Sequence, residues 1–383
     1  MHVAIIGGGL AGPCLAHGLQ RAGFQVTLHE RDPEPARGQG YRIHIASEGN
    51  RALHDCLPEH LHRLVLATAG TPGSGVTIFA GDLTVINRFV VNDPAAELTP
   101  DSGISVDRLT LRTILLAELE KVTRFGSEFT GFEVLPGDRV RARFADGAVQ
   151  EADLLVAADG SMSRVRRQLL PHARVVDLGM RLIFGKTPLT GEVAAITPAE
   201  SLDGFSTVVG SGGRFMPLAG HQFRRDPREA AAEVRSGLEF TDTRDYVMWV
   251  LGTPDDVSAL DGAGLRDAAR ERVADWHPHL GEIIRRADPA TVRTASMRTS
   301  EPVKPWPSGP VTLVGDAIHC MVPAGIGAAV ALRDAALLTR RLTDARDRGL
   351  PLVEAVHAYE AEMLQYGFEA VAAAAKQAGL TTA

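Results

Sequence analysis

Residues 2–30 read HVAIIGGGLAGPCLAHGLQRAGFQVTLHE, and this stretch decides the fold. It begins with a short apolar run at 2–6, rich in β-branched side chains, which is typical of a strand buried on both faces. A glycine-rich turn follows, then residues 13–22 of helical composition and an alternating strand at 25–28. The order strand, glycine turn, helix and strand predicts a Rossmann-like βαβ unit and places the chain in the α/β class.

The turn in this unit satisfies the pattern G-x-G-x-x-G. Gly7 permits the tight turn, Gly9 lets the backbone approach a pyrophosphate, and Gly12 allows the helix to pack closely on the strand. Glu30 lies 18 residues beyond Gly12, near the spacing of an acid that accepts hydrogen bonds from ribose hydroxyls. Because a carboxylate there would repel a 2′-phosphate, we expect the bound dinucleotide to be FAD or NAD rather than NADP.

A second motif lies in residues 153–167, DLLVAADGSMSRVRR. Residues 154–157 are predicted to form another buried strand, and Asp159-Gly160 follows it as a turn, with Ser163 and Arg166 beyond. Taken alone, an Asp-Gly pair is a common turn. The Asp-Gly pair therefore indicates a cofactor site only in combination with the glycine-rich turn and with a third motif near the end of the chain.

The third motif lies in residues 311–338, VTLVGDAIHCMVPAGIGAAVALRDAALL. A predicted strand at 311–314 runs into Gly315-Asp316, and Gly325 and Gly327 open a helix after a loop that contains His319. An aspartate at the end of a buried strand is costly unless its charge or its acceptors are used. His319 is open to two interpretations, a catalytic base or a residue that holds the turn.

These three motifs in this order resemble the class A flavoprotein monooxygenases, the family of p-hydroxybenzoate hydroxylase and the tetracycline-inactivating monooxygenases. The resemblance covers nearly the whole chain. It implies a GR2-type Rossmann-like FAD-binding domain, an inserted β-sheet substrate domain and carboxyl-terminal helices. It also implies that NAD(P)H reduces FAD, that reduced flavin takes up O₂ as a 4a-hydroperoxide, and that oxygen passes to an electron-rich substrate carbon. The flavin carries this chemistry, so no catalytic residue is assigned.

The resemblance also implies which residues hold FAD. The first motif would bind its ADP half, the Asp-Gly motif would touch FAD and the nicotinamide nucleotide, and Asp316 would accept hydrogen bonds from the ribityl chain. Arg108 opens an amphipathic helix, 106–119, near the cofactor, and Arg42 in GQGYRIHI reaches the flavin. The predicted cofactor residues are Gly7, Gly9, Leu10, Ala11, Gly12, Glu30, Arg31, Arg42, Arg108, Asp159, Gly160, Asp316, Pro323, Gly325, Gly327 and Ala328.

One departure from the family pattern concerns the third motif. Many relatives read Gly-Ala-Asn where this chain reads Gly327-Ala328-Ala329, and Ile326 stands where Gln is frequent. The Ala329 side chain cannot donate or accept a hydrogen bond. This departure keeps open a non-redox cyclase or ligand-binding protein that retains FAD as a scaffold, and a flavin-dependent oxidase or dehydrogenase stays open beside it.

The middle of the chain, 175–300, shows strand-like runs without a Rossmann repeat. We expect it to be a substrate-binding β-sheet domain between two parts of the FAD-binding domain, 1–174 and 301–383, with a substrate-side segment around 70–105. Its few charged motifs suggest an apolar, aromatic or polycyclic substrate. The candidate pocket residues are Phe184, Phe205, Phe215, Met216, Met248 and Trp249.

Composition narrows the remaining classes. The 383 residues are 45% hydrophobic and 23% charged with a net charge of −7, and without a basic stripe we expect no nucleic-acid partner. Three separated cysteines indicate neither a disulfide framework nor a zinc site, and His60 and His62 lack the further ligands of a metal site. We expect a cytoplasmic protein without a membrane span, whose partners are substrate and O₂ and whose oligomeric state is open.

Overall fold

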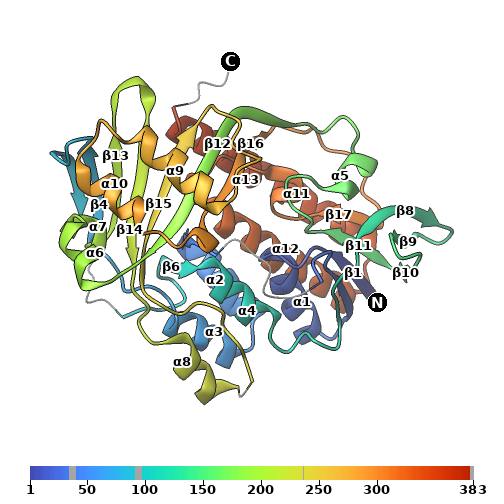
Figure 1. Ribbon diagram of the computed structural model, residues 1–383. Helices are drawn as coiled ribbons and strands as arrows, with labels where there is room; N and C mark the ends of the chain where they lie inside the picture. Colours follow the sequence, from blue (N-terminus) through green and yellow to red (C-terminus); the bar gives the residue numbers. More distant parts are fainter. Residues whose placement is uncertain (34–39, 91–96, 236, 380–383) are drawn as a thin grey trace.

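Two sheets dominate the computed structural model, which describes residues 1–33, 40–90, 97–235 and 237–379. A parallel sheet has the strand order β17-β11-β1-β2-β7, and a larger mixed sheet has the order β16-β12-β15-β14-β13-β4-β5. The two sheets lie at opposite ends of the molecule with long helices between them (Figure 1). This confirms the expected α/β class with a Rossmann-like part and an added β-sheet.

The parallel sheet follows the predicted strands closely. The helix after the first glycines begins at Ala11, two residues earlier than predicted, because Pro13 is tolerated in a first turn whose amides have no partner within the helix. The elements of this part are β1 (His2–Ile6), α1 (Ala11–Arg21), β2 (Gln25–His29), β7 (Thr123–Arg124), β11 (Leu154–Ala157), α5 (Arg164–Leu169), β17 (Val311–Leu313) and α11 (Asp316–His319).

A three-stranded antiparallel meander connects β7 to β11, a feature that the sequence reading did not include. It projects from the side of the parallel sheet, far from the mixed sheet (Figure 1). Arg141 on the middle strand bridges Glu133 and Glu151 on its two neighbours, at 2.6 and 2.5 Å. The strands are β8 (Phe129–Leu135), β9 (Arg139–Phe144) and β10 (Val149–Ala152).

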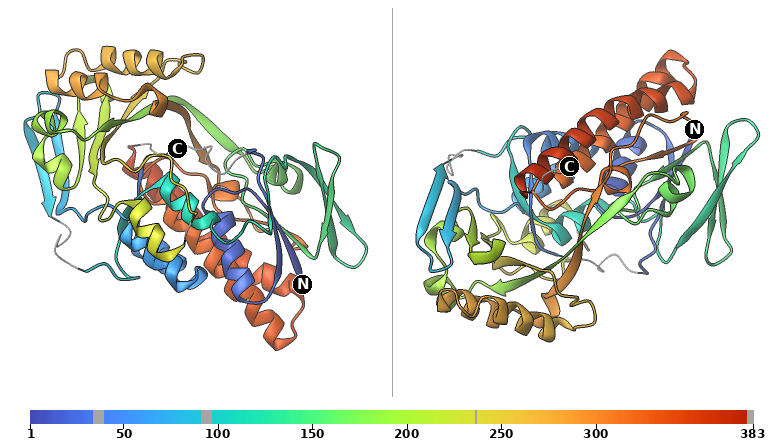
Figure 2. Two further views of the ribbon diagram at one scale, coloured as in Figure 1. Left: turned by 60° about the horizontal axis from the view of Figure 1, so that its bottom comes forward. Right: turned by 90° about the horizontal axis from the view of Figure 1, so that it is seen from above.

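Helices α12 (Gly327–Arg348) and α13 (Leu352–Gln377) run side by side through the molecule (Figure 2). α12 packs on α1 and on α2 (Ser47–Cys56), and small residues at these contacts let the helices approach closely. The buried free thiols of Cys14 and Cys56 form a hydrogen bond between α1 and α2. This hydrogen bond and burial both raise the pKa of Cys14. No described helix combines the length and apolar character needed to cross a bilayer.

The mixed sheet has one face covered by helices and the other turned toward the parallel sheet. α9 (Gly262–Arg272) and α10 (Pro278–Arg285) cover its outer face (Figures 1 and 2). The domain limits at 174 and 300 stay predictions. The strands are β4 (Gly75–Ala80), β5 (Val85–Val90), β12 (Val175–Pro188), β13 (Phe205–Val209), β14 (Phe215–His221), β15 (Tyr246–Thr253) and β16 (Arg293–Ser300).

A small antiparallel pair joins the two sheets. Its strands are β3 (Arg42–Ile45) and β6 (Ile104–Asp107), and β6 leads directly into α4 (Arg108–Leu116). Asp107 is the N-cap of α4, since its Oδ1 accepts from the backbone N of Leu109 and Thr110 at 3.0 and 2.9 Å. The remaining helices are α3 (Glu59–Ala67), α6 (Gly191–Ile196), α7 (Ala199–Asp203) and α8 (Pro227–Val234).

Candidate cofactor and substrate site

Four neighbouring strands of the parallel sheet end in one row. The register pairs Leu313 with Ala157, Ala157 with Ile6, and Ile6 with His29. Because the strands are parallel, the residues that follow all emerge at the same edge, where α/β folds bind their ligands. The three predicted motifs therefore come together here, although Gly7 and Asp316 are 309 positions apart in the chain. We call this set the cofactor edge: Gly7, Gly9, Gly12, Glu30, Asp159, Gly160, Gly315 and Asp316.

Glycine is required at each position of the first motif for a different physical reason. Gly7 has φ +115°, and a β-carbon on Gly12 would lie 2.0 Å from the carbonyl oxygen of Gly7. Both positions therefore exclude larger residues within the protein itself. A β-carbon on Gly9 would meet no heavy atom of the described residues within 4 Å. Open space above Gly9 is what the close approach of a pyrophosphate to the backbone requires, so this feature fits a dinucleotide.

Glu30 is fixed at the end of β2 by the glycine turn. Its Oε2 accepts from the backbone N of Gly8 at 2.7 Å, and its Oε1 accepts from the backbone N of Asp32 at 2.9 Å. Arg112 lies 3.5 Å from Glu30 and donates through Nε to the carbonyl of Gly8 at 2.7 Å. Arg112 was missed in the sequence, although it lies four residues after Arg108 and so on the same side of α4. Arg31, which follows Glu30, has an exposed side chain.

The Asp-Gly motif joins the first and third motifs. Asp159 Oδ2 accepts from the backbone N of Arg164 at 2.9 Å, while its Oδ1 is buried without a partner in the described part of the chain, and desolvation raises its pKa. Gly160 has φ +76° with open space around it. Arg166 donates to the carbonyls of Ala317 at 2.8 Å and Ser161 at 2.9 Å, so this buried cation ties the two loops together. The unpartnered Asp159 oxygen fits a bound hydroxyl or amide donor.

The third motif rests on a buried hydrogen-bond network. Asp334 Oδ2 accepts from the backbone N of Gly315 at 2.6 Å and from His319 Nε2 at 2.7 Å, and its Oδ1 accepts from the hydroxyl of Tyr366 at 2.5 Å. Burial opposes a charge on His319, but the nearby Asp334 carboxylate raises its pKa above the ordinary value. Both side chains are fully buried. His319 thus holds the turn that presents Asp316.

Asp316 points out of this network. Its side chain reaches solvent, whereas both neighbouring residues in the chain are buried. Reduced hydration in the surrounding protein raises its pKa, and His319 and Arg108 partly oppose that shift. A carboxylate whose acceptors are open at the sheet edge fits the hydroxyl groups of a ribityl chain. Arg108 lies at the start of α4, and its backbone N donates to the carbonyl of Tyr41 at 2.9 Å.

The start of α12 lies beside the third motif. Pro323 and Gly325 are exposed, and the helix begins at Gly327 after the N-cap residue Ile326, whose apolar side chain does not cap the first amides. Ala328 is half-buried. Ala329, the departure from the family pattern, is fully buried, and a β-carbon on Gly49 of α2 would lie 2.8 Å from its methyl group. The alanine therefore serves the close packing of α12 on α2.

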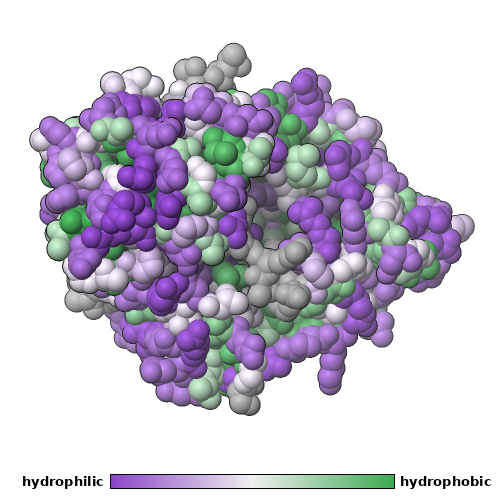
Figure 3. All heavy atoms as spheres, in the orientation of Figure 1, coloured by the Kyte–Doolittle hydropathy of each residue, from purple (hydrophilic) through white to green (hydrophobic). Residues whose placement is uncertain are grey.

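The predicted pocket residues divide between the two faces of the mixed sheet. Phe184 packs on Tyr41 with ring centroids 4.8 Å apart, and Phe205 lies under the guanidinium of Arg42. Met248 lies in the same small inner cluster. Phe215 contacts the backbone position of Gly252, which shares the inner face of β15 with Met248. In the space-filling view the surface is hollowed between the two sheets (Figure 3).

The prediction is wrong for Met216 and Trp249. Both are fully buried in the core between the sheet and α9 and α10. Trp249 donates through Nε1 to the hydroxyl of Thr187 at 3.2 Å. Side chains alternate across a strand, so each lies on the face opposite to its neighbours in the chain, Phe215 and Met248.

A buried polar group links the mixed sheet to the rest of the site. Lys186 Nζ lies 2.6 Å from Asp107 Oδ2, which also accepts from the hydroxyl of Tyr246 at 2.9 Å. Burial alone would raise the pKa of Asp107, but the ammonium of Lys186 lowers it below the ordinary value. We call Arg42, Asp107, Lys186, His221 and Tyr246 the sheet junction. The sequence reading singled out only Arg42 among them.

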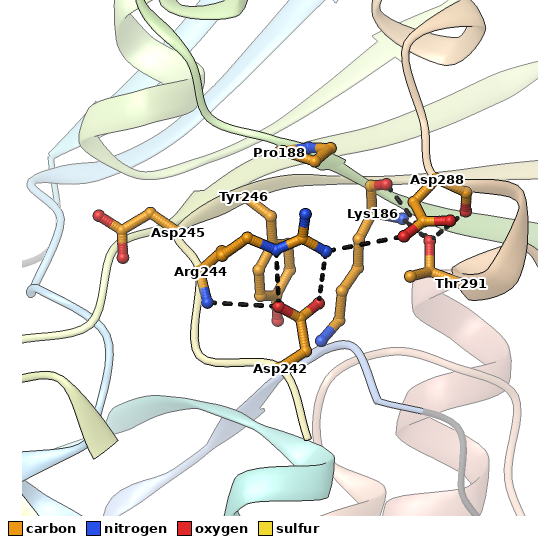
Figure 4. A pocket seen from close by; sticks show the side chains of 8 residues that line it. All are labelled: Lys186, Pro188, Asp242, Arg244, Asp245, Tyr246, Asp288 and Thr291. Atoms are coloured by element: carbon orange, nitrogen blue, oxygen red, sulfur yellow. Dashed lines mark hydrogen bonds and ion pairs between the residues drawn. The ribbon is translucent and has the colours of Figure 1, made fainter. Parts of the chain in front are cut away.

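His221 completes the sheet junction as a neutral ring. Its centroid is 5.2 Å from that of Tyr246, and both ring nitrogens are buried without a partner in the described part of the chain. Desolvation lowers its pKa to about 3. Lys186 and Tyr246 also line a polar hollow, together with Pro188, Asp242, Arg244, Asp245, Asp288 and Thr291 (Figure 4). There Arg244 is held by Asp242 at 3.0 Å and Asp288 at 3.6 Å, so its charge is already matched.

Comparisons with known proteins agree with this geometry. The chain is 30% identical over 381 residues to the dual O-methyltransferase/FAD-dependent monooxygenase elcB of Phaeosphaeria nodorum. The matched region covers 88% of this chain but only 39% of that protein. It is 28% identical over 344 residues to the 6-hydroxynicotinate 3-monooxygenase of Bordetella bronchiseptica, covering 88% of this chain and 82% of that one. The chain thus spans about two fifths of the length of the first of these relatives.

Solved structures share the fold over nearly the whole chain. The crystal structure of a candidate FAD containing monooxygenase from Photorhabdus luminescens superposes with a TM-score of 0.84 at 29% identity, covering 99% of this chain and 97% of that one. Klebsiella pneumoniae HpxO, crystallised with FAD and uric acid, gives a TM-score of 0.77 at 23% identity, covering 99% and 88%. The model of the family described as "FAD binding domain" matches residues 1–374, and the chain belongs to that family.

Proposed function

We propose that this protein is an FAD-dependent monooxygenase that uses NAD(P)H and O₂ to hydroxylate an aromatic or polycyclic small molecule. The observation that carries the proposal is the cofactor edge, where three distant motifs meet in one row opposite the inner face of a second sheet. The same edge carries an open approach to Gly9, an unpartnered Asp159 oxygen and an accessible Asp316 carboxylate. The names of the relatives in both comparisons support the reaction type.

The proposed roles of the residues follow from their positions along the edge. Glu30 accepts from the ribose, the turn at Gly7 and Gly9 receives the pyrophosphate, and Asp316 accepts from the ribityl chain. The start of α12, which has no cap from the Ile326 side chain, would offer its amides to negative charge on the ring of bound FAD. The remaining proposed cofactor contacts are Leu10, Ala11, Gly12, Arg31, Arg108, Asp159, Gly160, Pro323, Gly325, Gly327 and Ala328.

Bound FAD would supply the redox chemistry. In the overall reaction a substrate C–H, O₂, NAD(P)H and one proton give a substrate C–OH, NAD(P)⁺ and water. The protein has to orient the substrate and keep water away from the reacting atoms. Phe184, Phe205, Phe215 and Met248 on the inner face of the mixed sheet are apolar and suit both tasks.

The test starts from purified protein and its yellow cofactor. We expect NADPH or NADH to bleach the flavin without oxygen, and ¹⁸O₂ to label the product formed from an electron-rich phenol, indole, quinolone or polyketide. Product labelled from water, or turnover that releases only hydrogen peroxide with every candidate substrate, would indicate an oxidase or dehydrogenase. Flavin that neither nucleotide reduces, with or without substrates, would indicate a non-redox scaffold.

The Asp316 assignment has its own test. Asp316→Ala removes the carboxylate that is proposed to accept hydrogen bonds from the ribityl chain, so we expect FAD to be lost. Because the Asp316 side chain is exposed, we expect the fold to survive. Asp101→Ala, an exposed aspartate that pairs with Arg51 on the surface, is the matched control and should keep its FAD. Full retention of the yellow cofactor in Asp316→Ala would reject the role.

We also propose a cytoplasmic location. All three cysteines are buried free thiols, a state that a reducing compartment preserves. Fractionation of the producing cells with an antibody against the chain tests this location, and recovery from an extracellular fraction would contradict it.

A further inference from the structure

Arg42 is a half-buried cation without an acidic partner in the described part of the chain. Its Nε is buried and makes no hydrogen bond to any residue that the structure describes, and its guanidinium lies 5.9 Å from the ring centroid of Phe205. Desolvation lowers its pKa, and among the described residues only Tyr246 opposes that shift. Desolvating a guanidinium without pairing it is unfavourable, so such a group is expected to meet an anion when the site is filled.

The position of Arg42 lies between the two halves of the site. Arg42 and His44 are two residues apart on β3, so their side chains leave the same face of the strand. A β-carbon on Gly325 would lie 4.0 Å from Cβ of His44, which places this end of the face beside the loop before α12. The guanidinium of Arg42 contacts Phe205 of the mixed sheet. Arg42 therefore reaches from the cofactor side into the space in front of the mixed sheet.

The charges of the described neighbouring residues do not compensate Arg42. The ammonium of Lys186 is matched by Asp107 at 2.6 Å. His221 is neutral near pH 7, since its pKa is lowered to about 3. The hydroxyl of Tyr246 donates to Asp107, and its pKa is raised well above the ordinary value, so it stays protonated. The sheet junction thus carries two cations and one carboxylate.

We propose that Arg42 binds an anionic oxygen group of the substrate, a carboxylate or an ionised phenol, while the attached aromatic ring packs on Phe205 and Met248. The guanidinium fork matches a carboxylate with two parallel hydrogen bonds, and the flanking apolar side chains suit a ring. This narrows the substrate class and rests on the proposed function. It also changes the role predicted from the sequence, in which Arg42 contacts the flavin. An anionic group of the cofactor is the competing source of the same charge.

The experiment compares acids with their neutral amides on the FAD-loaded protein. Benzoate, 2-naphthoate and anthracene-2-carboxylate are titrated beside the three matching carboxamides, and binding is followed by the flavin difference spectrum and by calorimetry. A charge-assisted hydrogen bond predicts that at least one acid binds about tenfold or more tightly than its amide. Binding needs no turnover, and reduction of the flavin by NADPH is measured separately, so failure of this proposal is distinct from failure of the monooxygenase assignment.

Variants then identify the residue and the source of the anion. Arg42→Gln should abolish the preference for the acid and leave FAD affinity within about twofold, and Arg42→Lys should keep part of the preference. Arg51→Gln removes an exposed arginine with the same change of charge and should keep the full preference. The proposal is overturned if no acid binds, if acid and amide bind the wild type equally, or if Arg42→Gln keeps the preference. Loss of FAD from Arg42→Gln with the acid preference intact would assign the residue to the cofactor.

Discussion

The cofactor edge and the sheet junction face each other across the site, but they are built in different ways. At the cofactor edge, each motif lies within one short segment of the chain, the longest being 7–30, and the backbone supplies most of the geometry through turns and strand ends. At the sheet junction, Asp107 meets Lys186 and Tyr246 across 79 and 139 positions of the chain, and only side chains make the contacts. Local backbone geometry is therefore visible in a sequence, whereas a long-range cluster of side chains is not.

The two regions should also respond differently to substitution. A glycine at the cofactor edge matters through the space it leaves, and a charge at the sheet junction matters through the partner that it neutralises. The largest effect is expected at the junction, where a partner is removed and a charge stays behind.

Lys186→Met leaves the carboxylate of Asp107 buried without its cation. Since Lys186 and Asp107 are 5% and 1% exposed, we expect a loss of about 3–5 kcal/mol in the free energy of unfolding. Urea unfolding of the apoprotein measures it. Asp107→Asn combined with Lys186→Met removes both charges and keeps an acceptor for the α4 amides, so the double variant should be more stable than Lys186→Met alone. If the double variant is no more stable than Lys186→Met, the unpaired charge of Asp107 is not the cause of the destabilisation.

Gly12→Ala tests the cofactor edge by crowding. Its β-carbon would lie 2.0 Å from a backbone oxygen, which must move, and we expect a cost of about 3 kcal/mol. The matched control is Gly9→Ala, where the added methyl meets no atom of the residues described in the structure within 4 Å. That change should alter apoprotein stability by only about 0.5 kcal/mol and yet weaken FAD binding. If Gly9→Ala binds FAD as tightly as wild type, the pyrophosphate does not approach this residue.

Most of the fold at the cofactor edge could be predicted from the sequence. Strands 2–6 and 154–157 have the predicted bounds, because short apolar runs that lead into a glycine or Asp-Gly turn have few other structures available. The meander β8–β10 was not predicted, since its strands carry charged residues on an exposed face. Its cross-strand arginine and glutamate pairs become recognisable only when the register is known.

The inner face of the mixed sheet could not be predicted in the same way. Residues 246–251 read YVMWVL, an apolar run without alternation, because one face packs on α9 and α10 and the other on the site. Nothing in such a run tells Met248 from Trp249, and one of the two was assigned to the wrong face. Lys186 and His221 gave no signal either, since single polar residues in strands are more often exposed than buried in a cluster.

Tyr366→Phe probes the network under the third motif. It removes the hydroxyl that donates to the buried carboxylate of Asp334. Because hydrogen bonds to charged groups are stronger than neutral ones, we expect the free energy of unfolding to fall by about 1.5–3 kcal/mol. Tyr359→Phe, on the same helix, removes a hydrogen bond to the neutral carbonyl of Leu313 at 2.8 Å and should cost about 1 kcal/mol. Thermal unfolding of both apoproteins compares them. Equal losses would mean that the charge on Asp334 does not strengthen its hydrogen bond.

His221→Phe gives the smallest effect and separates the two regions by pH. In the folded protein desolvation lowers the pKa of His221 to about 3, whereas the unfolded chain takes up a proton near 6.5. The unfolded state therefore binds more protons as pH falls below 6.5, and the folded state loses stability through this residue. Between pH 6.5 and 5.5 the free energy of unfolding of the wild type should fall by about 1 kcal/mol more than that of His221→Phe, whose ring can still pack beside Tyr246.

The other buried histidines do not disturb this comparison. His17, His29 and His62 also have pKa values lowered to about 4 and contribute equally to both proteins, so the difference between the two unfolding curves isolates His221. Parallel curves over this range would mean that His221 finds a hydrogen-bond partner when charged, and that the sheet junction is more open to water than its burial indicates.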